Sequence, residues 1–103
     1  MDFEWDAAKE RKNRARHGVS FEEASTLFTS GVDYLEIYDV EHSEEDDRFI
    51  AIGLTRRGLL VVVFTEPHEE RVRIISARFA TAREGRLFGR YMEKSRWSRT
   101  SES

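Results

Sequence analysis

The hydrophobic positions of this chain change their spacing near residue 34. Before that point they recur at helical intervals, as in Phe21, Ala24, Leu27 and Phe28, and after it they alternate or run continuously, as in strands. A helical pattern returns beyond residue 81. This order predicts two helices, then a sheet, then a last helix, which is an α+β architecture.

Two short helices are expected within the first thirty residues. Asp6 can N-cap a helix that runs to about residue 16, with Gly18 as its left-handed stop. Ser20 and Glu23 form a capping box that opens a second helix, which ends before residue 31. Because the connecting turn is short, we expect the two helices to pack as a hairpin or a bent pair.

Four strand-like segments follow, and short turn-like stretches connect the last three. They read "YLEIYD" at residues 34–39, "RFIAIGL" at 48–54, "LLVVVF" at 59–64 and "RVRIISA" at 71–77. Consecutive strands with short connections predict an antiparallel meander. The continuous apolar run at 59–64 predicts an interior strand that is covered on both faces for part of its length.

The C-terminal part begins with a second capping box, formed by Thr81 and Glu84. The helix that it opens has one apolar stripe, made of Leu87, Phe88, Tyr91 and Met92. Residues 95–103, "SRWSRTSES", are polar, and we expect a loosely ordered, flexible tail there. Residues 1–94 then form a single domain.

Charge is unevenly distributed along the 103 residues, although the net charge is only −3. Residues 33–47 hold eight carboxylates and no base, whereas residues 71–99 hold nine bases and two carboxylates. A basic C-terminal third allows nucleic acid as a ligand, and a solvated helix face is the alternative. A third possibility is that the acidic stretch imitates nucleic acid and folds over the basic third.

Composition also indicates the cellular compartment of the protein. The chain has no cysteine, so it has no disulfides and no thiolate metal site. The N-terminus lacks the features of a signal peptide, and no stretch approaches the roughly 20 apolar residues of a membrane span. We therefore expect a cytoplasmic protein.

The first helix carries a polar row that could take part in chemistry. Lys9, Asn13 and His17 are spaced four residues apart, so they fall on one face of the helix. His17 lies near the C-terminal end of the helix, where the helix dipole favours the charged imidazolium. The alternative is a solvent-facing stripe whose histidine caps the last carbonyls.

Arg78 stands where the last strand gives way to the last helix. A guanidinium in that position can grip a phosphate together with the free N–H groups of the helix start, or it can form a salt bridge with Glu84 or with the acidic segment. In a regular strand Arg73 and Arg78 point to opposite faces, and only a bulge would bring them to one face. Arg48, directly after the acidic segment, could neutralise that segment or join a phosphate site.

The histidines do not form a metal site by spacing. No pair of them has the spacing of metal ligands, and the acidic segment lacks the pattern of a calcium loop. We therefore expect neither a metal nor another cofactor. Glu84 has capping as its first role.

These motifs together resemble the BrnT family of type II toxins. The resemblance rests on "FEWDAAKERKNRARHGVSFEEASTLF", a central Arg48, "GLLVVVFT" and "RIISARFATAREGRL", and it covers residues 3 to about 92. It implies a RelE-like fold, with two N-terminal helices packed on a four-stranded antiparallel sheet and a C-terminal helix after it. It also implies a ribonuclease that arrests translation.

The resemblance implies a partner as well. A BrnA-type antitoxin with a ribbon-helix-helix DNA-binding domain would neutralise the toxin in a heterotetramer, and operator DNA would be reached only through that antitoxin. The substrate would be RNA, free or ribosome-associated. The competing interpretation is a non-catalytic module of the same fold that binds RNA or the antitoxin.

Resemblance and residue chemistry together give the candidate site residues. The candidate catalytic residues are Lys9, His17, Arg48, Arg78 and Glu84. The candidate RNA-binding residues are Asn13, Arg73, Arg83, Phe88 and Tyr91. Phe88 stands where the family usually has a tyrosine, so either Tyr91 takes over a hydroxyl role or the hydroxyl is dispensable. In this hypothesis Arg78 and Arg48 stabilise the phosphate, His17 or Lys9 supplies a proton or charge, and Glu84 is a possible base.

Overall fold

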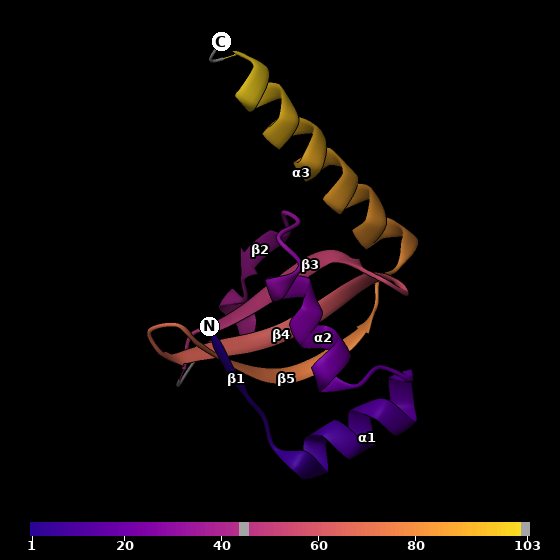
Figure 1. The fold of residues 1–103 in the computed structure, drawn as a ribbon, viewed down its shortest axis with the longest axis vertical. Coiled ribbons are helices and arrows are strands. Elements are labelled where there is room, and N and C mark those ends of the chain that lie inside the picture. The colour runs from indigo at the N-terminus through magenta and orange to yellow at the C-terminus, as the bar shows by residue number, and fades with distance from the viewer. Residues whose placement is uncertain (44–45, 102–103) are drawn as a thin grey trace.

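The computed structural model of the protein describes residues 1–43 and 46–101. Along the chain the elements are β1 (Asp2–Glu4), α1 (Ala7–His17), α2 (Phe21–Thr29), β2 (Leu35–Tyr38), the 3-10 turn η1 (Val40–His42), β3 (Arg48–Thr55), β4 (Gly58–His68), β5 (Arg71–Phe79) and α3 (Ala82–Ser101). The strands form one sheet in the order β1-β5-β4-β3-β2, with α1 and α2 beside it and α3 leading away from it (Figure 1).

The two N-terminal helices begin and end where their capping residues predict. The Asp6 carboxylate accepts hydrogen bonds from the backbone N–H groups of Ala8 and Lys9, at 2.8 and 3.0 Å. Gly18 takes the left-handed conformation that stops α1, with φ of 70°. The Ser20 hydroxyl accepts a hydrogen bond from the Glu23 N–H at 3.0 Å and opens α2. The two predicted helices and their ends are therefore confirmed.

The sheet is larger than the sequence predicts. The antiparallel meander from β2 to β5 is confirmed, and β4 is an interior strand between β3 and β5. The prediction of a four-stranded, purely antiparallel sheet was wrong, because β1 adds a fifth strand that runs parallel to β5. Three residues are too few to show the alternation that marks a strand, so the N-terminal segment gave no signal.

One face of the sheet packs against α2 and forms the core, while α1 lies along β5. Helix α2 contributes Phe21, Ala24 and Leu27, all at most 1% exposed. The sheet contributes alternate residues of three strands, which are Ala51, Leu60, Val62, Phe64, Val72, Ile74 and Ala77. A Cβ at Gly53 would lie 2.8 Å from the Cγ of Leu27, so glycine permits the close approach of α2 to β3.

A β-bulge changes the direction of side chains partway along β5. Val63 pairs with Ser76, but Phe64 pairs with Ile74, so Ile75 is the extra residue. Because partners across antiparallel strands share a face, this shift moves Arg78 to the face that Arg73 occupies, opposite the core. The two arginines therefore share a face, as the sequence allows only when a bulge interrupts the strand.

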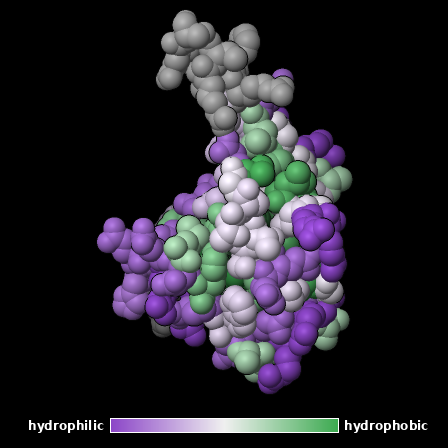
Figure 2. Space-filling model, in the orientation of Figure 1, coloured by the Kyte–Doolittle hydropathy of each residue, from purple (hydrophilic) through white to green (hydrophobic). Residues whose placement is uncertain are grey.

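Helix α3 extends further than the sequence predicts. The backbone is helical through Ser101, whereas the sequence predicts a loosely ordered tail from residue 95, of which residues 102–103 lie outside the described part. The molecule measures 48 × 28 × 26 Å, and α3 extends along its longest axis (Figure 1). Figure 2 shows hydrophobic residues gathered where α3 leaves the body. Leu87 of α3 is 42% exposed, as expected of a helix that packs along only part of its length.

Asn13 joins the first helix to the sheet. It is 7% exposed, and its amide nitrogen donates to the carbonyls of Val19 and Ala77 at 3.0 and 2.8 Å. Its amide oxygen accepts from the N–H of Ala77 at 3.1 Å. The expectation that Asn13 contacts RNA does not fit this burial, because its amide is already engaged with the turn after α1 and with β5.

Replacement of Asn13 with alanine should destabilise the fold by about 2–4 kcal/mol, because three hydrogen bonds are lost and backbone groups remain buried without partners. Urea unfolding of the purified variant measures this change. The exposed Lys12 on the same helix is the matched control, and Lys12→Ala should change stability by less than about 0.5 kcal/mol. Equal midpoints for the Asn13 and Lys12 variants would contradict the structural role of the amide.

Candidate functional site

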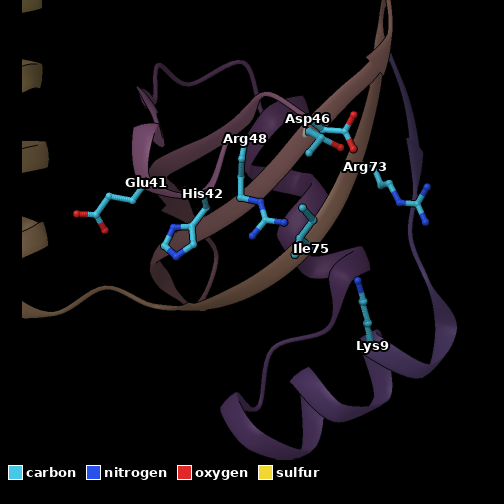
Figure 3. Close-up of a pocket in the computed structure, with 8 residues that line it drawn as sticks. Lys9, Glu41, His42, Asp46, Arg48, Arg73 and Ile75 are labelled. Atoms are coloured by element: carbon cyan, nitrogen blue, oxygen red, sulfur yellow. The ribbon is translucent and has the colours of Figure 1, made fainter. Parts of the chain in front are cut away.

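An open pocket of about 540 Å³ lies on the sheet face opposite the core. Its size suits a ligand such as a nucleotide. Helix α1, η1, strands β3 to β5 and the segment before β3 all contribute to it (Figure 3). The lining residues are Lys9, Glu41, His42, Asp46, Arg48, Thr65, Arg73 and Ile75.

Strand register places the two arginines of the pocket in one row. Arg48 of β3 pairs with Thr65 of β4, and Thr65 pairs with Arg73 of β5. Neighbouring strands lie about 4.8 Å apart, so the backbones that carry the two guanidinium groups are about 10 Å apart. Two residues separated by 25 positions in the sequence thus flank one space.

Lys9 reaches the same space from α1. It lies one helical turn before Asn13, whose hydrogen bonds to Ala77 fix α1 along β5. In Figure 3 the Lys9 side chain extends from α1 toward the region where the Arg48 guanidinium lies near Ile75. The pocket is therefore bordered by three cations from three separate elements.

Arg48 is the cation with an unmet hydrogen-bonding capacity. The residue is half-buried, and its Nε is buried with no hydrogen-bond partner among the described residues. A buried donor without a partner is unfavourable, and an anionic ligand would satisfy it. Arg73 is different, because its guanidinium bonds Glu4 at 3.3 Å in an exposed ion pair that contributes little to stability and can be exchanged.

A closed ring of backbone and hydroxyl hydrogen bonds ties η1 to the start of β3. The Asp39 N–H donates to the Arg48 carbonyl at 2.8 Å, and the Arg48 N–H donates to the Ser43 hydroxyl oxygen at 2.9 Å. The Ser43 hydroxyl in turn donates to the Asp39 carbonyl at 2.6 Å. The turn that carries His42 is thus anchored on the residue that supplies the central guanidinium.

His42 is a pocket residue that the sequence analysis missed. Its Nδ1 lies 2.9 Å from Oδ2 of Asp39. The sequence of this stretch indicates only an acidic segment, and its histidine lacks the spacing of a metal ligand. The three-residue spacing of Asp39 and His42, followed by a serine, was the available signal, since such a spacing closes a single turn.

Arg78 and Glu84 lie at the other end of this sheet face and bond each other. The two guanidinium NH groups each donate to one carboxylate oxygen at 2.7 Å, and Glu84 also accepts from the Thr81 N–H at 2.9 Å. Arg78 pairs with Val61, four residues before Thr65, which is a separation of about 13 Å along β4. Neither residue lines the pocket, and the salt-bridge alternative for Arg78 is what the structure contains.

The electrostatics of this pair argue against Glu84 as a base. The hydrogen bonds from Arg78 lower the pKa of Glu84 from its ordinary 4.5 to about 2, with a further contribution from the Thr81 N–H. The same contact raises the pKa of Arg78. A carboxylate this stabilised has little affinity for a proton near neutral pH, and its hydrogen bonds hold the start of α3 on the end of β5.

The remaining predicted site residues lie outside the pocket lining. His17 is at the far end of α1, about 12 Å along the helix axis from Lys9. Arg83 is exposed in the first turn of α3, and Phe88 and Tyr91 are half-buried on that helix. Of the predicted site residues, three line the pocket, which are Lys9, Arg48 and Arg73. The others lie outside the lining.

The acidic segment contributes residues to the pocket lining on either side of positions 44–45. Among the described residues it supplies Glu41, Asp46 and His42 to the lining, while Glu44 and Glu45 lie outside the described part.

Within residues 1–43 and 46–101 no group of three or more His, Cys, Asp or Glu side chains is placed to hold a metal ion. No helix among these residues is long and apolar enough to cross a membrane.

The fold and the pocket define a class of small α+β protein in which one face of a sheet carries several cations around an open pocket. The sequence model of a family described as "Ribonuclease toxin, BrnT, of type II toxin-antitoxin system" matches residues 5–84. The chain therefore belongs to the BrnT family of ribonuclease toxins. The match ends in the first turn of α3, so most of that helix lies beyond it.

A solved structure supports this assignment. The crystal structure of the Brucella abortus ribonuclease toxin BrnT is similar at a TM-score of 0.60, with 25% sequence identity. The similarity covers 79% of this chain and 97% of the Brucella chain. No curated protein sequence is significantly similar to the chain.

The Arg78–Glu84 pair should make stability depend on acid pH. Because the folded-state pKa of Glu84, about 2, is below its unfolded value of 4.5, the pair stabilises the fold fully above pH 4.5. This contribution should be lost as the pH falls through about 2. In Glu84→Gln, urea midpoints should therefore fall less between pH 6 and pH 3 than in the wild type.

The matched control is Glu93→Gln, which changes an exposed carboxylate on the same helix. It should keep the wild-type dependence on pH. At pH 6 the Glu84→Gln change should cost about 1–2 kcal/mol, since the ion pair is partly solvent-exposed. A wild-type pH dependence in Glu84→Gln would rule out the pair as its source.

Proposed function

We propose that this chain is a metal-independent endoribonuclease toxin that binds the scissile phosphate in the pocket bordered by Lys9, Arg48 and Arg73. The observation that carries the proposal is the buried Nε of Arg48, a donor without a partner among the described residues, within a space bordered by two further cations. A phosphodiester offers acceptor oxygens to this donor and negative charge to the three cations.

RNA is the substrate that this chemistry favours. Its 2′-OH is an internal nucleophile, so cleavage requires only a proton acceptor, a proton donor and cations near the phosphoryl oxygens. As the 2′-oxygen attacks, negative charge accumulates on the phosphoryl oxygens. Guanidinium and ammonium groups therefore stabilise the transition state more strongly than they stabilise the ground state. In this proposal Arg48 and Lys9 stabilise the transition state directly, and Arg73 exchanges Glu4 for phosphate.

The partner that we propose is a BrnA-type antitoxin with a ribbon-helix-helix domain, in a heterotetramer that represses its own operon. Membership of a type II toxin–antitoxin family supports an antitoxin. Support also comes from exposed apolar residues at the α3 end of the sheet, which are Leu54, Phe79 and Leu87. Free toxin would cleave cytoplasmic RNA, in solution or on ribosomes, and arrest translation.

Alanine at Arg48 should reduce RNA cleavage by at least about 100-fold, because a transition-state contact is lost. Lys9→Ala should act in the same direction. Cleavage of a mixed-sequence RNA by purified protein in the presence of EDTA, with fragment ends checked for 2′,3′-cyclic phosphate, measures both. The control is Arg56→Ala, because Arg56 is exposed in the β3–β4 turn at the opposite end of β3.

Several results would count against this proposal. Full activity in well-folded Arg48→Ala and Lys9→Ala would remove the pocket from the reaction, and loss of cleavage with EDTA would remove metal independence. If the wild-type protein binds RNA tightly but does not cleave it, the result would instead support a non-catalytic binding module of the same fold.

A further inference from the structure

Hydrogen bonds fix the position of His42 in the pocket. Its ring bonds Asp39 at 2.9 Å, its own N–H donates to the Asp39 carbonyl at 3.3 Å, and the turn is anchored on Arg48. The Asp39 side chain is 13% exposed, whereas that of His42 is 61% exposed. The orienting carboxylate is therefore sheltered, while the imidazole is open to solvent at the pocket.

The contact with Asp39 defines which ring nitrogen is available. A carboxylate only accepts hydrogen bonds, so Nδ1 of His42 carries the proton in this pair. In the neutral ring Nε2 is then the basic nitrogen. An imidazole oriented in this way by a carboxylate is the arrangement that general acid–base catalysis requires.

We propose that His42 is a catalytic residue of the pocket, the group that takes the proton from the 2′-OH, and that Asp39 is its positioning residue. The inference rests on the proposed ribonuclease function and specifies its base. As the bond between the 2′-oxygen and phosphorus forms, the proton moves to Nε2 of His42. The bond between phosphorus and the 5′-oxygen breaks, and the products are a 2′,3′-cyclic phosphate and a 5′-hydroxyl.

The proton for the leaving 5′-oxygen has a source in the same pocket. A guanidinium does not give up its proton at accessible pH, so Arg48 and Arg73 act only as cations. The ammonium of Lys9 can donate one and recover it from solvent. His42 and Lys9 then return to their starting forms by exchange with water, so each turnover balances.

Other candidate bases are less suited to this role. The Glu84 carboxylate is held by Arg78 and by the Thr81 N–H, and it lies outside the pocket lining. His17 also lies outside that lining. Glu41 and Asp46 line the pocket, but a carboxylate is a weaker base than an imidazole at neutral pH.

The test compares His42→Ala and His42→Asn with the wild type in single-turnover RNA cleavage. Both should lower the rate by about 10²- to 10⁴-fold. The asparagine side chain retains an N–H group that can bond Asp39. This variant therefore removes the base but keeps the hydrogen bond that holds the turn. Affinity for a fully 2′-O-methylated RNA, which cannot be cleaved, should change less than about 3-fold, because His42 acts on the proton rather than on binding.

Two readouts separate a proton acceptor from a structural histidine. Added imidazole should restore a measurable part of the cleavage by His42→Ala. The wild-type rate should rise with pH as the base loses its proton, and this rise should disappear in both variants. The charged groups that affect this profile are Asp39, which bonds the ring, and the pocket residues Glu41, Asp46, Arg48, Arg73 and Lys9.

Asp39→Asn tests the positioning role. It should lower kcat by about 10- to 100-fold with KM little changed, because the ring loses its fixed tautomer but the cations remain. His68→Ala is the control for removal of an exposed histidine, since His68 lies at the end of β4 outside the pocket lining, and it should retain wild-type cleavage.

The outcomes distinguish this inference from the function on which it rests. If the wild type cleaves RNA and Arg48→Ala does not, but His42→Ala cleaves at the wild-type rate with an unchanged pH profile, the assignment of His42 is wrong and the proposed function stands. Absence of rescue by imidazole together with weakened binding of the methylated RNA would make His42 a binding residue instead. A wild type that does not cleave RNA overturns both.

Discussion

The buried amide of Asn13 is the interaction on which the arrangement of the site depends. A helix that packs on a sheet through apolar side chains alone can slide along it at small energetic cost, because such contacts are non-directional. Hydrogen bonds are directional, and the three made by Asn13 fix α1 to a single residue of β5 and to the turn that follows the helix. The position of Lys9 over the pocket follows from this fixed point.

The other side of the pocket is fixed in a similar way, by hydrogen bonds to backbone groups. Arg48 holds the turn of Asp39 and Ser43 through its main-chain N–H and carbonyl, so its side chain is not used in this anchoring. The same residue therefore anchors the turn through its backbone and lines the pocket with its side chain. Binding of phosphate by Arg48 and proton transfer by His42 would in this arrangement be coupled by geometry, without any moving part.

Local rules explain what the sequence predicted correctly. Helix ends depend on capping residues close in sequence, so Asp6, Gly18 and Ser20 marked them well, and the reciprocal Thr81–Glu84 box forms as expected. The strand order followed from short connections between alternating segments. Each of these features needs information from fewer than about ten neighbouring residues.

What the sequence did not reveal depends on contacts between distant residues. The bulge at Ile75 is a choice between two registers, and the sequence of β5 alone does not select one. Asn13 resembles any solvent-facing polar residue until Ala77, 64 positions later, comes beside it. The role of Arg78 was open between phosphate and Glu84, and only the path of the chain into α3 decided it.

The length of α3 has a consequence for how the protein behaves in solution. A compact chain of roughly 100 residues has a radius of gyration of about 13 Å, whereas here it is 14.2 Å. The excess comes from a helix that extends past its support on the sheet (Figure 1). Friction during sedimentation and small-angle scattering both depend on this elongation, so a hydrodynamic mass inferred from a spherical shape would overestimate the monomer.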